Sequence, residues 1–312
     1  MNVPILFCHY GISDYLKYTL KSARYFNPNK EIVLLGDSQN RSLAISENVR
    51  HVYLKDYESS ELLFNFEKVY LHTAGDSHGR EFWLKFNFKR YYYIHEFLKQ
   101  ESINSCWYFD SDVLILSDLN KQELKFHNFD FAVHSNINGY INSRETLSLY
   151  LEHNISTFTD SEFLLNQRKK IDLNSNLALT EMATFKTFIQ NTKIKHSILK
   201  KNINSESFDE SILNADGMEL IEIPFQEKKF KKLYADLSGN IFCRDATSLF
   251  FVKMMTLNMS GAPTSFYRKI FYTSLTSKHF HNSNLFFNYK YILVFNYSFI
   301  LRFWHRILSY II

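Results

Sequence analysis

Two aspartates separated by a single residue form the most chemically suggestive pattern in this 312-residue chain. Asp110 and Asp112 lie in the stretch Tyr108-Phe109-Asp110-Ser111-Asp112-Val113-Leu114-Ile115-Leu116, between two apolar runs. This pattern predicts a buried strand that opens into a polar site, with both carboxylates on the same side of an extended segment. Two such carboxylates repel each other unless they share a cation, and Mg2+ or Mn2+ takes oxygen ligands of this kind. A nucleoside diphosphate bound to that cation would be a good leaving group.

The Asp-x-Asp spacing alone does not establish a metal site. Short patterns arise by chance, and a strand-end turn capped by two solvated aspartates also explains the tripeptide. The elements that position the two aspartates therefore decide between these interpretations.

The segments before the acidic pair predict an α/β fold. We expect strands at 5–8, 32–35, 52–54 and 107–109, a helix capped by Ser13 that ends near Phe26, and an aromatic helix over 81–99. A strand, a helix and a strand at this spacing form a βαβ unit with parallel strands, and such sheets bind ligands at the carboxyl ends of their strands. The acidic pair lies at such an end. The aromatic residues of 82–97 favour positions in the core.

The second half of the chain is less regular. We expect a strand at 129–133, helices at 143–152, 160–170 and 178–190, a strand at 221–225, and mixed structure over 226–282. Asp209 and Asp216 fit loop or turn positions.

Composition restricts the class of protein. With 46% hydrophobic and 22% charged residues, the chain is globular and can bury a large core. No acidic residue follows Asp245, and the basic residues beyond it are Lys253, Arg268, Lys269, Lys278, Lys290, Arg302 and Arg306. A basic, aromatic end favours contact with phosphates, nucleotides or anionic lipid. Because the chain has no nucleic-acid recognition motif, we do not expect nucleic acid as a partner.

The last 28 residues form a distinct segment. We expect the main domain over 1–284 and a basic aromatic tail over 285–312. The longest charge-free run of the tail, 291–301, is shorter than the roughly 20 apolar residues that span a bilayer. Arg302 and Arg306 share one helical face and Trp304 lies elsewhere, which is typical of a helix at a membrane surface. A last helix packed on the core is the alternative.

The cysteines and the first residues of the chain bear on the cellular compartment of the protein. Cys8, Cys106 and Cys243 have no metal or redox spacing, which favours a reducing compartment. The start of the chain has no basic region followed by a long apolar stretch, so we predict no signal peptide. We expect a cytoplasmic protein, with the tail at the inner face of the cell membrane as a further expectation.

Several segments taken in order resemble bacterial glycosyltransferases of the GT-A fold. They are 10–16, 22–24, 35–37, 82–92, 108–113, 180–182, 208–210 and 278–282. The acidic pair is the most specific of these segments. The resemblance implies a mostly parallel, Rossmann-like sheet flanked by helices, a nucleotide-sugar donor that is UDP-linked, and Mn2+ or Mg2+.

The resemblance also implies roles for individual residues. Asp112 would be the main metal ligand, Asp110 would contact the ribose or the water shell of the metal, and His279 would be a further ligand. The nucleoside would be framed by His9, Tyr10, Gly11 and Asp37.

One segment departs from the family. The late histidine of these enzymes is often followed by a Gly and a Lys, whereas residues 281–284 here are His-Asn-Ser-Asn. Lys278 is therefore the candidate for binding phosphate, and the choice between His279 and His281 as the metal ligand stays open.

Glu181 is a candidate catalytic residue at an expected helix start. It could deprotonate an acceptor hydroxyl or hold the donor sugar, and a carboxylate there also stabilises the helix dipole. The expected activity is sugar transfer to a hydroxyl of a glycan or lipid-linked acceptor in surface polysaccharide or glycolipid synthesis, with inversion and retention both open. A sugar-phosphate nucleotidyltransferase is an alternative that usually has a Gly-rich phosphate loop after the first strand. A non-catalytic carbohydrate-binding protein is a second alternative, which would not need the acidic pair.

Overall fold

The computed structural model describes residues 3–75, 81–135, 137–200, 205–222, 228–276 and 290–291. These residues form two compact units. The first unit contains the chain up to Ser111 and residues 118–199, and the second contains residues 112–117 and those from 200 onward. Lys278, His279, His281 and the predicted tail, apart from 290–291, lie outside the described residues.

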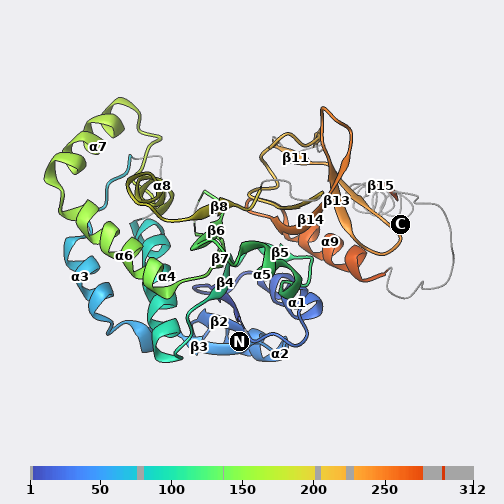
Figure 1. Ribbon diagram of the computed structural model, residues 1–312, viewed down its shortest axis with the longest axis horizontal. Coiled ribbons are helices and arrows are strands. Elements are labelled where there is room, and N and C mark those ends of the chain that lie inside the picture. Colours follow the sequence, from blue (N-terminus) through green and yellow to red (C-terminus); the bar gives the residue numbers. More distant parts are fainter. Residues whose placement is uncertain are drawn as a thin grey trace, which may run out of the picture. The chain divides into compact units, whose positions relative to one another are not determined.

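A mixed sheet forms the centre of the first unit. Its seven strands in the described part of the chain follow the order β3-β2-β1-β4-β7-β6-β8 (Figure 1). They are β1 (Ile5–Cys8), β2 (Ile32–Gly36), β3 (Arg50–Tyr53), β4 (Cys106–Asp110), β6 (Phe131–Val133), β7 (Gly139–Ile141) and β8 (His196–Ile198). Strands β3, β2, β1 and β4 are parallel, β7 is antiparallel to β4 and β6, and β8 is parallel to β6. The predicted α/β class with a mostly parallel sheet is confirmed.

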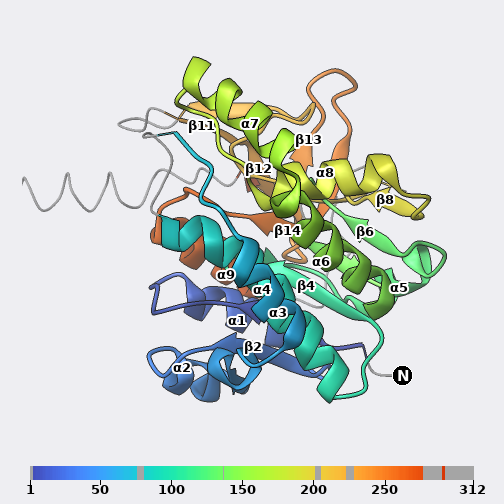
Figure 2. The same cartoon turned by 90° about the vertical axis from the view of Figure 1, so that its left-hand side faces the viewer.

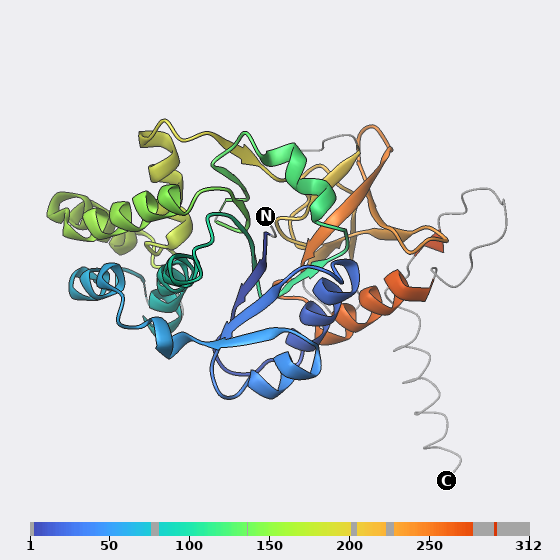
Figure 3. The ribbon, with the colours of Figure 1, turned by 60° about the horizontal axis from the view of Figure 1, so that its bottom comes forward.

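Helices flank this sheet. They are α1 (Leu16–Phe26), α2 (Arg41–Ser46), η1 (Leu54–Tyr57), α3 (Glu61–Val69), α4 (Glu81–Gln100), α5 (Asn120–Phe126), α6 (Arg144–Thr159), α7 (Ser161–Leu173) and α8 (Glu181–Asn191). Strand side chains alternate between faces, and Leu6 and Cys8 share one core cluster with residues of α3, α4, α6 and α8. Trp107 of β4 instead packs on Phe126 of α5. Figure 2 shows α3, α4 and α6 side by side, and in Figure 3 the strands lie between these helices and the blue helices α1 and α2.

The predicted bounds of strands and helices agree with the structure where the hydrophobic pattern is most regular. The expected strands at 5–8, 32–35 and 107–109 and the helix over 81–99 correspond to β1, β2, β4 and α4. The expected cap at Ser13 is wrong, because α1 begins at Leu16 and no side chain caps it. Ser13 contributes its carbonyl oxygen instead, which accepts a hydrogen bond from the Leu16 backbone N–H at 3.0 Å.

The second unit is mainly antiparallel. Its larger described sheet has the order β15-β12-β13-β14-β5, with β9 parallel to β14, and β10 and β11 form a separate pair. The strands are β5 (Val113–Ile115), β9 (Glu206–Phe208), β10 (Leu220–Glu222), β11 (Lys229–Lys231), β12 (Leu233–Ala235), β13 (Ile241–Arg244), β14 (Phe251–Asn258) and β15 (Lys290–Tyr291). The helix α9 (Thr264–Thr276) follows β14. None of the described helices is long and apolar enough to cross a membrane.

The structure corrects the extended segment that we predicted through the acidic pair. Asp110 ends β4 of the first sheet, Ser111 and Asp112 form a turn, and Val113 begins β5 of the other sheet. The apolar residues on both sides are buried as expected, but they belong to different sheets. Asp110 and Asp112 therefore do not share one face of a strand.

A glycine in β7 gives a test of the first sheet. Gly139 has a φ of +151°, and a Cβ there would lie 2.4 Å from the Ala132 carbonyl oxygen. We expect Gly139→Ala to lower the free energy of unfolding by about 2–4 kcal/mol, because backbone strain and a clash with a fixed carbonyl add together. Urea unfolding followed by tryptophan fluorescence measures this change.

The control is Gly11→Ala in the same unit. Gly11 has a φ of +78°, but nothing lies within 4 Å of the added Cβ. Gly11→Ala should lower the free energy of unfolding by only about 1–2 kcal/mol, because a residue with a Cβ is strained at a positive φ. Equal costs at the two positions would contradict the close approach in β7.

Candidate functional site

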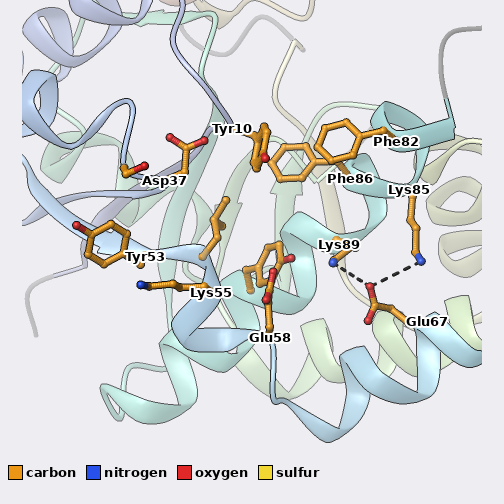
Figure 4. A pocket seen from close by; sticks show the side chains of 14 residues that line it. Tyr10, Asp37, Tyr53, Lys55, Glu58, Glu67, Phe82, Lys85, Phe86 and Lys89 are labelled. Carbon is orange, nitrogen blue, oxygen red and sulfur yellow. Dashed lines mark ion pairs between the residues drawn. The ribbon is translucent and has the colours of Figure 1, made fainter.

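A pocket of about 510 Å³ lies at the carboxyl ends of the first three parallel strands. Tyr10 follows β1, Asp37 follows β2, and Tyr53 ends β3. The facing wall is α4, where Phe82 and Phe86 lie beside Tyr10 (Figure 4). Open α/β sheets bind ligands at this edge. The pocket thus lies at the carboxyl ends of parallel strands, where we expected a ligand to bind.

Asp37 ties together the loops that follow β1 and β2. Its Oδ2 accepts the backbone N–H of Gly11 at 2.6 Å, and its Oδ1 accepts that of Gln39 at 2.8 Å. Asn40 strengthens this junction by donating to the carbonyl oxygens of His9 and Gly11 at 3.1 and 2.9 Å. Of the four residues expected to frame a nucleoside, Tyr10 and Asp37 line the pocket, and His9 and Gly11 do not.

His9 holds the middle residue of the acidic motif. Its Nδ1 lies 2.8 Å from Ser111 Oγ, and Thr19 Oγ1 donates to the Ser111 carbonyl oxygen at 2.7 Å. His9 is buried, and its Nε2 has no hydrogen-bond partner among the described residues. Burial lowers the pKa of His9 to about 4, against a weaker opposing effect of Asp37. His9 is therefore a neutral anchor for Ser111 at physiological pH.

Asp110 is held from three directions at the end of β4. Its Oδ1 accepts hydrogen bonds from Arg90 Nη1 at 2.6 Å and from the Tyr108 hydroxyl at 3.0 Å. Its Oδ2 accepts from Asn138 Nδ2 at 3.3 Å. A carboxylate bonded in this way has a fixed orientation.

Arg90 links Asp110 to Glu181. Arg90 Nη2 lies 3.0 Å from Glu181 Oε1, and both side chains are buried. Burial opposes the charge of Arg90, but Asp110 and its neighbours outweigh it and raise the pKa of Arg90 well above its ordinary value. Burial raises the pKa of Glu181 despite the opposing charge of Arg90. One buried cation thus serves two carboxylates, and we name these three residues the Arg90 network.

Glu181 begins α8, as its position in the sequence predicted. The N-cap of α8 is Thr180, whose side chain accepts the backbone N–H of Ala183 at 3.3 Å. The Glu181 side chain turns to Arg90, and the residue is only 5% exposed. This burial favours a role in positioning Arg90 over direct contact with an acceptor.

The acidic pair can offer a hard cation one carboxylate ligand, that of Asp112. Asp112 supplies a half-buried carboxylate, and its carbonyl oxygen accepts the backbone N–H of Met259 at 3.0 Å within the second unit. Asp110 already accepts hydrogen bonds from Arg90 and Tyr108 at one oxygen. No three His, Cys, Asp or Glu side chains of the described residues gather as a metal-binding group. Since Mg2+ usually takes only one or two protein carboxylates, Asp112 alone is compatible with it.

The second unit contains a buried ion pair that we did not predict. Asp209, which was expected in a loop or turn, is fully enclosed, and its Oδ1 lies 2.5 Å from Lys231 Nζ. Its Oδ2 accepts the backbone N–H of Asn258 at 3.1 Å. Lys231 also pairs with Asp216 at 2.9 Å, and Asp216 has the positive φ of a turn residue. The pair joins the end of β9 to β11 and β14.

The sequence did not assign a role to several residues of the site. Arg90 lies within the segment that resembles glycosyltransferases, and its partner Glu181 is 91 positions away. Phe82 and Phe86, which were expected in the core, line the pocket, whereas Phe88, Tyr91 and their neighbours further along α4 are buried as expected. A repeat of aromatic and lysine residues at helical spacing over 82–93 is the signal that could have indicated the pocket wall.

No family model and no curated protein matches the chain. Among solved structures, an active-site mutant of LgtC shares 12% identity over 88% of this chain and 96% of its own, with a TM-score of 0.44. The galactosyltransferase LgtC with donor and acceptor sugar analogs shares 15% identity over 66% of this chain and 76% of its own, with a TM-score of 0.37. The glycosyltransferase GlyE of Streptococcus pneumoniae TIGR4 shares 12% identity over 66% of this chain and 47% of its own, with a TM-score of 0.36.

The pKa of His9 predicts a pH-dependent stability. Between pH 6.5 and 4 the unfolded chain binds a proton at His9 that the folded chain does not bind. The free energy of unfolding should therefore fall by up to about 3 kcal/mol as the pH is lowered through this range. His9→Asn, which retains a partner for Ser111 but does not titrate, should remove this part of the loss in urea unfolding. The exposed His127→Asn is the control, and a wild-type pH profile in His9→Asn would contradict the assignment.

The Arg90 network predicts strong coupling between its members. Arg90→Met should lower the free energy of unfolding by about 3–5 kcal/mol, because it leaves the buried Glu181 and the half-buried Asp110 without their cation. Glu181→Gln should lower the free energy of unfolding less in the Arg90→Met background than in the wild type. The difference between the two losses, which is the coupling energy, should be at least about 1 kcal/mol. A double-mutant cycle by urea unfolding measures this energy. Additive costs would show that the two side chains do not interact.

Proposed function

We propose that this chain is a metal-dependent glycosyltransferase that moves a sugar from a nucleotide-sugar donor, UDP-linked, to a hydroxyl of a glycan or lipid-linked acceptor. The observation that carries the proposal lies within the first unit. A pocket with aromatic and carboxylate side chains opens at the ends of β1, β2 and β3, and the neighbouring strand β4 ends at the clamped Asp110. This is an arrangement in which a nucleoside and its diphosphate can bind along one sheet edge.

The residues of the pocket suit a nucleoside. Tyr10 is 44% exposed, and its ring offers a face on which a base can stack. Asp37 offers carboxylate oxygens to the ribose hydroxyls while its hydrogen bond to Gly11 fixes its direction. Gly11 supports Asp37 through this hydrogen bond, and His9 supports the acidic motif through Ser111.

The Arg90 network sets the direction of Asp110. We assign Glu181 a positioning role through Arg90, because the carboxylate is buried and engaged with the guanidinium. Asp110 would then contact the ribose or the water shell of a metal, as the resemblance implies.

Mg2+ or Mn2+ would be held by Asp112, with His279 or His281 as a further ligand. When bound, the cation neutralises the charge that develops on the departing diphosphate. Lys278 is the proposed phosphate-binding cation. These assignments for Lys278, His279 and His281 come from the sequence alone, as does the proposed contact of the 285–312 tail with an anionic membrane surface.

Donor hydrolysis tests the proposal. We expect the full chain to release UDP from a UDP-sugar in the presence of Mn2+ or Mg2+, and excess chelator to stop this release. Asp112→Asn should lower the rate by about 100-fold or more, because it removes the charge that holds the cation. The exposed Asp172→Asn on α7 is the matched control.

The outcome distinguishes the alternatives. Full activity in Asp112→Asn or in chelator would reject a metal-dependent transferase. Release of diphosphate from a nucleoside triphosphate and a sugar phosphate would indicate a nucleotidyltransferase. Sugar binding without any turnover would indicate a carbohydrate-binding protein.

A further inference from the structure

One face of α4 forms a long wall of the pocket. Phe82, Lys85, Phe86, Lys89 and Tyr93 line the pocket at helical spacings of three and four residues. The aromatic rings of Phe82 and Phe86 lie beside Tyr10, and the two lysines reach toward the neighbouring helix α3 (Figure 4). The wall therefore has an aromatic part and a charged part.

The two lysines in the charged part of the wall both approach one carboxylate, that of Glu67 on the neighbouring helix α3. Lys89 Nζ lies 2.8 Å from Glu67 Oε1, and Lys85 Nζ lies 3.7 Å from the same oxygen. The three side chains are between 19% and 36% exposed, so a ligand in the pocket can reach them. We name these residues the Lys85–Glu67–Lys89 triad.

Glu67 and Lys89 favour their charged forms. Burial opposes the ionisation of Glu67, but its bond to Lys89 and the charges of Lys89 and Lys85 outweigh it and lower the pKa of Glu67. Burial also opposes the charge of Lys89, but Glu67 and Tyr93 outweigh it and raise the pKa of Lys89. In hydrogen-bond terms the triad offers a donor, an acceptor and a donor.

The sheet order indicates which part of a nucleotide meets the triad. This step rests on the proposed function. Strand β4, which ends at Asp110, neighbours β1, and β2 and β3 follow on the other side of β1. A diphosphate near Asp110 directs the nucleoside over β1 toward β2 and β3, where the pocket extends to α3 and α4. The base is then the part that reaches the triad.

Nucleobases differ in the order of hydrogen-bond donors and acceptors along their Watson–Crick edge. Uracil presents an acceptor, a donor and an acceptor through O4, N3–H and O2. Cytosine presents a donor and two acceptors, guanine an acceptor and two donors, and adenine one donor and one acceptor. Among these four, only uracil satisfies all three positions of a row of donor, acceptor and donor, and adenine satisfies two of them. Proteins that take up a single base commonly combine such edge contacts with stacking on an aromatic ring, which Tyr10 and Phe86 offer here.

We propose that the Lys85–Glu67–Lys89 triad determines the base specificity of this protein by reading the pairing edge of uracil. Glu67 accepts the uracil N3–H, and the two lysines donate to O4 and O2. Glu67 discriminates against cytosine, because the unprotonated N3 of cytosine would face a carboxylate with no hydrogen between them.

Binding of nucleoside diphosphates tests the triad. The full chain is titrated with UDP, CDP, GDP and ADP by isothermal calorimetry, each at the same Mg2+ concentration. We expect UDP to bind about tenfold or more tightly than CDP, since hydrogen bonds to charged groups are of that strength. Glu67→Gln should reduce the UDP-to-CDP ratio by about tenfold, because an amide can also donate to N3 of cytosine.

Matched variants distinguish base reading from a general loss of structure. Glu61→Gln lies on the same helix, is exposed and does not line the pocket, so it should retain the wild-type ratio. Lys85→Met and Lys89→Met should each weaken UDP binding by about tenfold, and Lys99→Met at the exposed end of α4 should not. Thermal melting of every variant confirms that it is folded.

The possible outcomes separate this inference from the proposed function. Equal binding of all four diphosphates, or an unchanged ratio in Glu67→Gln, overturns the triad as base reader and leaves the nucleotide site intact. Tighter binding of GDP, CDP or ADP than of UDP also overturns it. Absence of binding by every diphosphate, with and without Mg2+, overturns the nucleotide site itself.

Discussion

The buried Arg90 network is the interaction on which the rest of the candidate site depends. A guanidinium with almost no contact with solvent cannot be stable alone, so Arg90 requires carboxylates around it. Asp110 and Glu181 meet this requirement from β4 and α8, and Tyr108 and Asn138 complete the hydrogen bonds of Asp110. The need to satisfy one buried charge thus fixes the first carboxylate of the acidic motif. It also fixes the position of α4 against the end of β4.

The same helix therefore serves two purposes. Arg90 anchors α4 in the interior, while residues on a neighbouring face line the pocket. Because an α-helix places side chains at three- and four-residue intervals on one face, a rigid anchor at Arg90 also fixes where Phe86 and Lys89 point. A pocket wall built on such a helix is better ordered than one built on a loop, which suits recognition of a flat, rigid group such as a base.

The sequence predicted the parts of the fold that follow from local pattern. The apolar runs of β1, β2 and β4 and the length of α4 are readable because burial on a sheet or helix leaves a periodic trace. The choice of the strand with which a strand pairs is not visible in such a local pattern. Val113–Ile115 has the same apolar character as β4, yet it pairs with β14 in the other sheet, about 140 residues later in the chain. The buried pairs of Arg90 with Glu181 and of Asp209 with Lys231 were missed for the same reason, since side chains that meet only after folding carry no local signal.

The acidic motif illustrates how a segment can lie at the end of the predicted strand and still differ from the predicted conformation. An alternating strand would have placed both carboxylates on one face, but Ser111 is held by His9 and Thr19 and the chain turns there. The turn separates two environments. Asp110 belongs to the first unit and is saturated with hydrogen-bond donors at one oxygen, whereas Asp112 belongs to the second. Covalent geometry still keeps their Cα atoms within about 7 Å of each other. The two aspartates are therefore not equivalent, as a pair on one strand face would be: donors from β4, α4 and the loop before β7 hold the side chain of Asp110, whereas the backbone of Asp112 is bonded to Met259 of the second unit.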